Sequence, residues 1–232
     1  MAINQAVESM TPIWSPGSAN GYHAASYGWI LDELVYRWEG KTTGQVLAAE
    51  LTGSLGIKDL YLGLPDAEFP RMAKMVIIDP VPEARALTSD AVNAFAVRLS
   101  LSWVAGVATA TALAGLMNLL VDRGTRGGRA YFSEDTFSLA SRATNSPNET
   151  DRRLMRPIRW GLGFILGDTP DIYGTAPHAG VVGHAGGGAS VAWADPEKRL
   201  AVAFLCNGML TGGREWERYR RIGDVIYGFL RN

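Results

Sequence analysis

The sequence predicts an α+β fold, with helices over most of the first 155 residues and an antiparallel sheet with a terminal helix after them. Apolar residues recur at helical spacing over residues 27–38 and again over residues 213–230. Three short apolar runs are bounded by glycine, aspartate or proline, as strands are. These runs are residues 160–166, 189–194 and 200–206. We therefore divide the chain into residues 1–155, a mainly helical region, and residues 156–232, the strands and the last helix.

The helical region opens with a loop and two helices. Residues 12–21 are rich in proline, glycine and serine, which predicts an irregular loop. A helix is expected over residues 27–38, because Gly40 stops the apolar pattern as a C-terminal glycine does. A shorter helix is expected over residues 43–51. Residues 60–87 hold four prolines, which forbid a long helix and predict a surface excursion.

A long uncharged stretch follows. Residues 99–121 carry no charge over 23 positions, enough for a membrane span. The stretch contains serine, threonine and asparagine, and its flanks lack an aromatic belt, so a span is the disfavoured alternative. We expect a buried helix that begins near Gly106 and ends at residues 122–124. A further helix is predicted over residues 134–143 and a charged turn over residues 145–153.

The last third of the chain predicts an antiparallel meander. Residues 195–199, Asp-Pro-Glu-Lys-Arg, favour a hairpin turn, since proline sets the turn dihedral and the charges stay solvated. The final helix is expected to lie against the sheet through one apolar stripe. That stripe comprises Trp216, Tyr219, Ile222, Val225, Ile226 and Phe229. Cys206 is the single cysteine, cannot form an internal disulfide and is expected to be a buried small hydrophobe.

Composition excludes several classes of protein. An apolar content of 47% with seven tryptophans is ample for a core in 232 residues. Lys+Arg of 22 against Asp+Glu of 23 gives a formal charge of -1, so nucleic acid is not an expected partner. His23, His178 and His184 lack paired metal-ligand spacing, and no nucleotide-binding glycine loop is present, so we expect neither metal nor cofactor. Residues 1–8 lack the features of a secretory signal, from which we expect a cytoplasmic protein.

Two segments could carry chemistry. At residues 184–188, His-Ala-Gly-Gly-Gly, missing side chains allow a ligand close to the backbone, and Gly186 and Gly187 are candidate oxyanion or substrate-binding positions. The alternative is a glycine-rich turn beside a structural histidine. Tyr22 lies on the early loop, where a phenol can take part in proton transfer or can simply pack under the loop. His184 could polarise a substrate or accept a proton near neutral pH.

The order of these motifs resembles the serine β-lactamase-like family, with its closest pattern in the family VIII carboxylesterases. The resemblance rests on the Gly-His-x-Gly strand at residues 183–186, the Ala-Asp-Pro hairpin, the Ala-Val-Ala-Phe strand ending in Cys-Asn-Gly, and the Gly-Val-Ala-Thr segment at residues 106–109. It places Tyr22 at the motif tyrosine and His184 with Gly186 in place of the family's Lys-Thr-Gly. Ala24 stands where many relatives have asparagine. The implied fold is β-lactamase/transpeptidase-like: an antiparallel sheet flanked by helices, plus a helical region, incomplete at the N-terminus.

The family's nucleophile motif, Ser-x-x-Lys, does not occur in this sequence. The residues three positions before the four lysines are Trp38, Leu55, Arg71 and Asp195. Ser190 lies in a sequence that only approaches a Gly-x-Ser-x-Gly elbow. The resemblance implies hydrolysis of a small ester or lactam in the parent form, with Tyr22 and His184 as catalytic residues, and this chain is expected to be inactive. The alternative is a non-catalytic module that binds a small ligand or a partner strand, with self-association through an exposed sheet edge.

Overall fold

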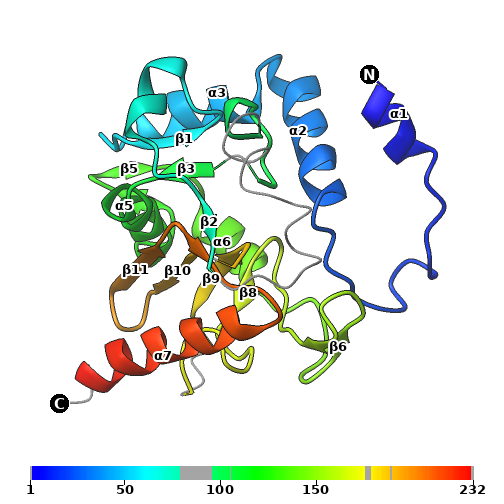
Figure 1. Cartoon of the computed structure of the whole chain (residues 1–232), viewed down its shortest axis with the longest axis vertical. Coiled ribbons are helices and arrows are strands. Elements are labelled where there is room, and N and C mark those ends of the chain that lie inside the picture. Colours follow the sequence, from blue (N-terminus) through cyan, green and yellow to red (C-terminus); the bar gives the residue numbers. More distant parts are fainter. Residues whose placement is uncertain (1, 79–95, 105, 176–178, 189, 231–232) are drawn as a thin grey trace.

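A four-stranded antiparallel sheet forms the centre of the protein (Figure 1). The computed structural model describes residues 2–78, 96–104, 106–175, 179–188 and 190–230. The sheet order is β11-β10-β9-β8, so strands that follow one another in sequence are neighbours, as a meander requires. The strands are β8 (Ile165–Leu166), β9 (Val182–Gly186), β10 (Ser190–Asp195) and β11 (Leu200–Leu205). Asp195 pairs with Leu200, which confirms the predicted hairpin turn.

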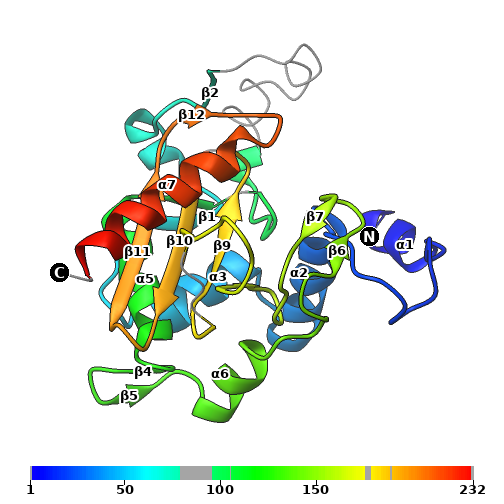
Figure 2. The same cartoon turned by 90° about the horizontal axis from the view of Figure 1, so that it is seen from below.

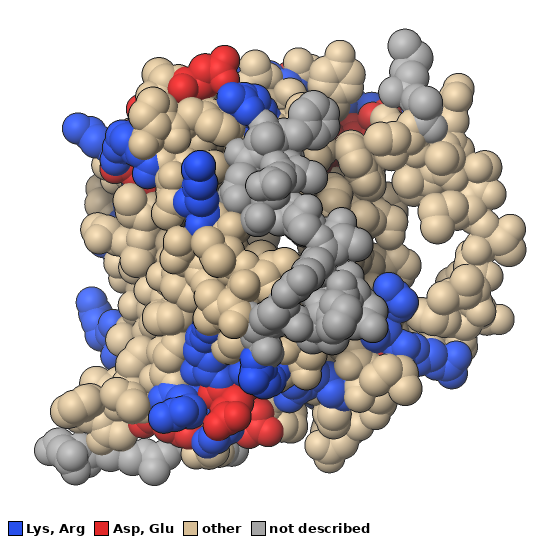
Figure 3. All heavy atoms as spheres, in the orientation of Figure 1, with Lys and Arg blue, Asp and Glu red and all other residues tan. Residues whose placement is uncertain are grey.

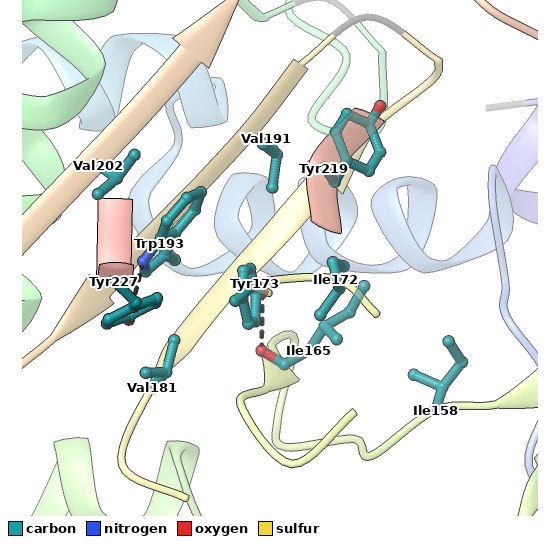
Figure 4. Packing of buried hydrophobic residues seen from close by; sticks show 10 residues of the cluster. All are labelled: Ile158, Ile165, Ile172, Tyr173, Val181, Val191, Trp193, Val202, Tyr219 and Tyr227. Atoms are coloured by element: carbon teal, nitrogen blue, oxygen red, sulfur yellow. Dashed lines mark hydrogen bonds between the residues drawn. The ribbon is translucent and has the colours of Figure 1, made fainter. Parts of the chain in front are cut away.

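Two helices cover the two faces of this sheet. Figure 2 shows α7 (Arg214–Phe229) crossing one face, with α5 (Ala110–Val121) behind the other. Successive residues of a strand point to opposite faces, and Trp193 accordingly packs in the α7 core while Ala194 packs with the α5 side. The α7 core, drawn in Figure 4, comprises Ile158, Ile165, Ile172, Tyr173, Val181, Val191, Trp193, Val202, Tyr219 and Tyr227. This arrangement, an antiparallel sheet with a helix on each face, is the one that the family resemblance implies.

The uncharged stretch is not one long helix. Gly106–Ala108 forms β3, which pairs with β1 (Leu60–Leu62), so the predicted helix start near Gly106 is wrong. Thr109 sets the boundary, because its backbone is extended and its side chain accepts a hydrogen bond from the N–H of Ala112. Along α5 only Ala112 and Leu119 are buried, so the helix is less enclosed than expected. In the described part of the chain, no helix is long and apolar enough to cross a membrane.

The first predicted helix is present as α2 (Ser26–Glu39), and Gly40 ends it in the left-handed conformation with its N–H donating to Tyr36. Its apolar stripe, however, faces outward: Ile30 and Leu34 are about half exposed and Trp38 is 88% exposed. Helical spacing identifies the helix, but it does not say what covers the apolar face. The short helix α1 (Ala2–Glu8) lies beside α2, where Arg37 contacts Glu8 at 3.2 Å.

The remaining elements are short. The helix predicted over residues 43–51 begins with a capping box at Thr42 and Gln45, but its hydrogen bonding changes to a π-helix from Leu47. The others are α3 (Thr43–Val46), η1 (Leu47–Thr52), η2 (Asp66–Arg71), β2 (Val76–Ile77), η4 (Ala96–Arg98), β4 (Thr125–Arg126), β5 (Arg129–Ala130), α6 (Glu134–Ala140), β6 (Thr150–Asp151), β7 (Arg156–Pro157) and β12 (Gly208–Met209). Residues 79–87 of the predicted surface excursion lie outside the described residues, as does His178.

Two packing predictions need correction. In α7, Val225 and Phe229 are 60% and 77% exposed, because the helix turns Tyr219, Gly223 and Tyr227 toward the sheet instead. Cys206 is not a buried hydrophobe: it is half-buried, and its sulfur lies 3.1 Å from a guanidinium nitrogen of Arg218.

The division of the chain at residue 155 stays a prediction. On the face shown in Figure 3, basic and acidic side chains lie next to each other.

Candidate active-site cleft

Three aromatic rings from distant parts of the sequence meet in one cleft. Tyr22 stacks on Trp160 with ring centroids 5.8 Å apart and planes 2° from parallel. The His184 ring lies 5.9 Å from the Tyr22 ring and 6.1 Å from the Trp160 ring, tilted by 34° to each. The cleft has a volume of about 220 Å³. Its lining residues are Asn20, Gly21, Tyr22, His23, Tyr27, Thr144, Trp160, Gly161, Gly163 and His184.

The loop that carries Tyr22 is fixed by its own tryptophan. The indole of Trp14 donates a hydrogen bond to the carbonyl of Ala19 at 3.1 Å and lies against Gly21. A Cβ atom on Gly21 would stand 2.5 Å from the Trp14 ring, so glycine is required for this contact. The carbonyl of Asn20 accepts a hydrogen bond from the N–H of Arg152 at 2.9 Å. The loop predicted over residues 12–21 is thus anchored, and it delivers Tyr22 to the cleft.

Trp160 is held by the turn that precedes it. Its indole N–H donates to Asp151 at 3.1 Å, and its backbone N–H donates to the side chain of Asn145 at 2.9 Å. Asp151 is 1% exposed, and its other oxygen accepts the backbone N–H groups of Arg153 and Leu154. Sequence reasoning placed Trp160 only in a strand run and residues 145–153 only in a charged turn. The signal that could have found this residue is its position before Gly161 and Gly163, an aromatic ring beside two missing side chains.

His184 is half-buried on β9, where its surroundings favour the neutral imidazole. Its Nδ1 lies 2.7 Å from the carbonyl of Ala185, so this nitrogen carries the proton and Nε2 is left as an acceptor. Burial lowers the pKa of His184, and the contact with the Ala185 carbonyl offsets this only in part. A neutral imidazole with a free acceptor nitrogen can take a proton from a substrate or nucleophile.

The free energy of unfolding is expected to rise with pH where His184 titrates. The folded pKa lies below the ordinary value of about 6.5, so the unfolded chain binds the proton more readily. The contribution of His184 is complete above pH ~6.5 and is lost as the pH falls from there through the folded pKa. Urea unfolding over this pH range should show a slope that His184→Gln reduces. A slope that stays the same in His184→Gln would contradict the assignment.

Tyr22 is a phenol and not a phenolate. Burial raises its pKa above the ordinary value of 10.0, and within the described residues its hydroxyl has no hydrogen-bond partner. A lysine beside it would lower the pKa, but none of the lining residues is a lysine. In the cleft as the structure describes it, the Tyr22 hydroxyl can donate a hydrogen bond but cannot act as a base.

The two candidate oxyanion glycines follow His184 without lining the cleft. Gly186 ends β9, and its carbonyl accepts a hydrogen bond from the hydroxyl of Tyr219 at 2.9 Å. Gly186 and Gly187 are both exposed and are not among the lining residues. The structure therefore places Tyr22 and His184 side by side in the cleft. An oxyanion role for Gly186 and Gly187 stays a prediction. Within the described residues, no cluster of His, Cys, Asp and Glu is suited to a metal ion.

Neither Ser190, considered in the sequence analysis, nor Ser26, which the structure places beside a histidine, stands in a recognised nucleophile arrangement. Ser190 begins β10 directly after the β9 turn, so it lies in a hairpin and not in a strand-to-helix elbow. Ser26 begins α2, and its hydroxyl lies 3.1 Å from Nδ1 of His23. Among the described residues, no hydrogen bond or ion pair joins the other nitrogen of His23 to a third group, as the base of a triad requires.

Tyr27 and Gly163 form one wall of the cleft through a close contact. Gly163 has φ +80, and a Cβ atom there would overlap the hydroxyl of Tyr27. Gly163→Ala should lower the free energy of unfolding by about 1–3 kcal/mol, from backbone strain and this overlap. In a Tyr27→Phe background the same change should cost less, because the hydroxyl is gone. Chemical unfolding of the four proteins measures the coupling, and equal costs in both backgrounds would show that the contact is absent.

The fold and the cleft are those expected from the family resemblance, and a family model matches nearly the whole chain. The model of the family described as Beta-lactamase matches residues 2–225. The chain belongs to the beta-lactamase family.

Several relatives are similar to it. A penicillin-binding protein homologue from Caulobacter crescentus is 30% identical with a TM-score of 0.74, covering 94% of this chain and 61% of that protein. A family VIII carboxylesterase is 29% identical with a TM-score of 0.75, covering 92% of this chain and 61% of that chain. The esterase/beta-lactamase LipL of Mycobacterium tuberculosis is 27% identical over 222 residues, covering 83% of this chain and 49% of LipL. The chain thus spans about half the length of this curated relative.

Proposed function

We propose that this chain is the cleft-forming part of a serine hydrolase that cleaves a small ester or lactam through an acyl-serine. In this proposal Tyr22 and His184 act at the reacting group, and the backbone N–H groups of Gly186 and Gly187 stabilise the oxyanion. The chain alone does not acylate, because its sequence contains no Ser-x-x-Lys.

One observation carries the proposal. Tyr22 and His184, which the family resemblance assigned to two separate motifs, lie with their rings 5.9 Å apart in one cleft. Acyl transfer needs a proton acceptor and a hydrogen-bond donor near the same carbonyl. The acceptor nitrogen of His184 and the protonated phenol of Tyr22 supply one of each. The similarity to an esterase/beta-lactamase and to a family VIII carboxylesterase supports an ester or lactam as substrate.

Labelling with a fluorophosphonate tests whether the chain acylates. The intact protein is treated with the probe and weighed by mass spectrometry, and we expect no adduct. A stoichiometric adduct would show that a nucleophile is present, and peptide mapping would then distinguish Ser26 from Ser190.

The DNA upstream of the Met1 codon should encode an in-frame Ser-x-x-Lys if the hydrolase proposal is correct.

The second candidate is a non-catalytic module that binds a small ligand or a partner strand. It is favoured by the position of β11 at the end of the sheet, where it pairs on one side only among the described residues. Mixing the chain with a separately produced segment that carries Ser-x-x-Lys distinguishes the two. Restored esterase activity supports the hydrolase, whereas binding without activity supports the module.

Concentration-dependent dimerisation in gel filtration would indicate self-association through the β11 edge of the sheet.

A further inference from the structure

The cleft combines aromatic walls with a lining that contains no Lys, Arg, Asp or Glu. We infer that it binds a neutral aromatic or apolar group and rejects a group that carries a carboxylate. The inference rests on the proposed function, and within it favours neutral aryl or apolar esters over lactams that carry a carboxylate. It concerns ligand preference, which can be measured whether or not the chain acylates.

The walls favour a flat apolar ligand. Tyr22 and Trp160 are parallel within 2°, and His184 closes the third side of the group. Aromatic rings of this kind bind another ring by stacking or edge contact, in addition to the burial of its surface. Gly161 and Gly163 also line the cleft and contribute no side chains to it. A Cβ atom on Gly161 would stand 2.5 Å from the carbonyl of Ala140, so backbone packing favours glycine at this position.

The lining offers no lysine or arginine to pair with an anion. None of the ten lining residues is Lys, Arg, Asp or Glu, and the pKa of His184 is lowered by burial, so the imidazole is neutral at pH 7. A carboxylate moved into such a site loses its hydration without gaining a cation. Two arginines lie near the tyrosine loop but do not line the cleft. The guanidinium of Arg152 lies 5.4 Å from the ring centroid of Trp14, and the side chain of Arg153 packs near Gly21.

A matched pair of ligands tests the inference. Phenylacetamide and phenylacetate have the same size and ring and differ in whether the terminal group is neutral or charged at pH ~7.5. We expect phenylacetamide to bind at least about tenfold more tightly, by NMR titration of the whole chain. The indole N–H of Trp160 should shift as phenylacetamide binds. Equal affinities, tighter binding of phenylacetate, or no shift at Trp160 with either ligand would each overturn the inference.

A pair of variants tests the electrostatic step. Thr144 is exposed on the cleft rim, where its hydroxyl donates to the carbonyl of Trp160 at 3.1 Å. Relative to Thr144→Gln, Thr144→Lys should raise the affinity for phenylacetate several-fold more than that for phenylacetamide. Thr144→Gln loses the same hydrogen bond without adding charge, and so measures what the lost threonine alone does to the binding of both ligands. If Thr144→Lys gains nothing over Thr144→Gln, the missing cation is not what excludes the anion.

The proposal and its parent function fail separately. Fluorophosphonate labelling and complementation report on the nucleophile, whereas the titration reports on the cleft wall. A preference for phenylacetamide without restored hydrolysis in the mixing experiment would support the inference and favour the non-catalytic module. Restored hydrolysis with a preference for phenylacetate would support the hydrolase and overturn the inference.

Discussion

Trp193→Ala is expected to lower the free energy of unfolding by about 3–5 kcal/mol. Trp193 is 0% exposed, and its ring packs 5.3 Å from the ring of Tyr173 and 6.4 Å from that of Tyr227. Its indole N–H also donates to the hydroxyl of Tyr227 at 3.2 Å. Alanine would leave a cavity where the sheet meets α7 and would break this hydrogen bond (Figure 4). For a domain with a total stability of ~5–15 kcal/mol, the loss is large.

Trp38→Ala is the matched control, since the same side chain is deleted at a position that is 88% exposed. It should change the free energy of unfolding by no more than about 0.5 kcal/mol. Urea unfolding followed by far-ultraviolet circular dichroism measures both without relying on tryptophan fluorescence. Similar losses in the two variants would mean that the Trp38 surface is covered in solution or that the Trp193 core is not packed as described.

Gly223→Ala is expected to cause the second largest loss in the free energy of unfolding, because α7 packs at Gly223 against the backbone of Tyr173 and Gly174. A Cβ atom at this position would overlap the carbonyl of Tyr173 and the nitrogen of Gly174. Backbone atoms cannot turn aside as a side chain can, so the helix must shift. Overpacking costs ~1–3 kcal/mol or more. It outweighs the gain of about 1 kcal/mol that alanine brings inside a helix.

Gly228→Ala, in the same helix, separates these two effects. Nothing lies within 4 Å of a Cβ atom at Gly228, so only the helix propensity changes. This variant should be more stable than the parent by up to about 1 kcal/mol. Thermal unfolding of the two variants should therefore move in opposite directions. If both were stabilised, α7 would not contact the Tyr173 backbone in solution.

The elements that sequence reasoning located well are those fixed by neighbouring residues. The β10–β11 hairpin depends on Asp195 and the four residues after it, and Asp195 indeed accepts the N–H of Lys198 within the turn. Gly40 ends α2 because only a few residue types adopt the left-handed conformation easily. The family motifs led to Tyr22 and His184 through the residues directly beside each; the structure places the two rings in one cleft, and their catalytic role stays a prediction.

The features that sequence reasoning missed depend on contacts between distant segments. Nothing beside Trp160 in the sequence says that Asp151 holds its indole or that Tyr22 stacks on its ring. The apolar run at residues 106–108 became a strand because β1 is available to pair with it, which periodicity cannot show. Likewise, the stripe of α2 has the pattern of a buried face, yet Trp38 is exposed.

The assembly of the cleft from three distant segments links its occupancy to folding. Tyr22, Trp160 and His184 come together only when the loop, the turn and β9 are all in place. A partly unfolded chain therefore has no complete cleft, and a ligand that needs all three rings binds the native state alone. At a ligand concentration of 100 times Kd, such binding adds about 2.7 kcal/mol to the free energy of unfolding. The melting temperature of the protein thereby becomes a measure of how well a compound fits its cleft.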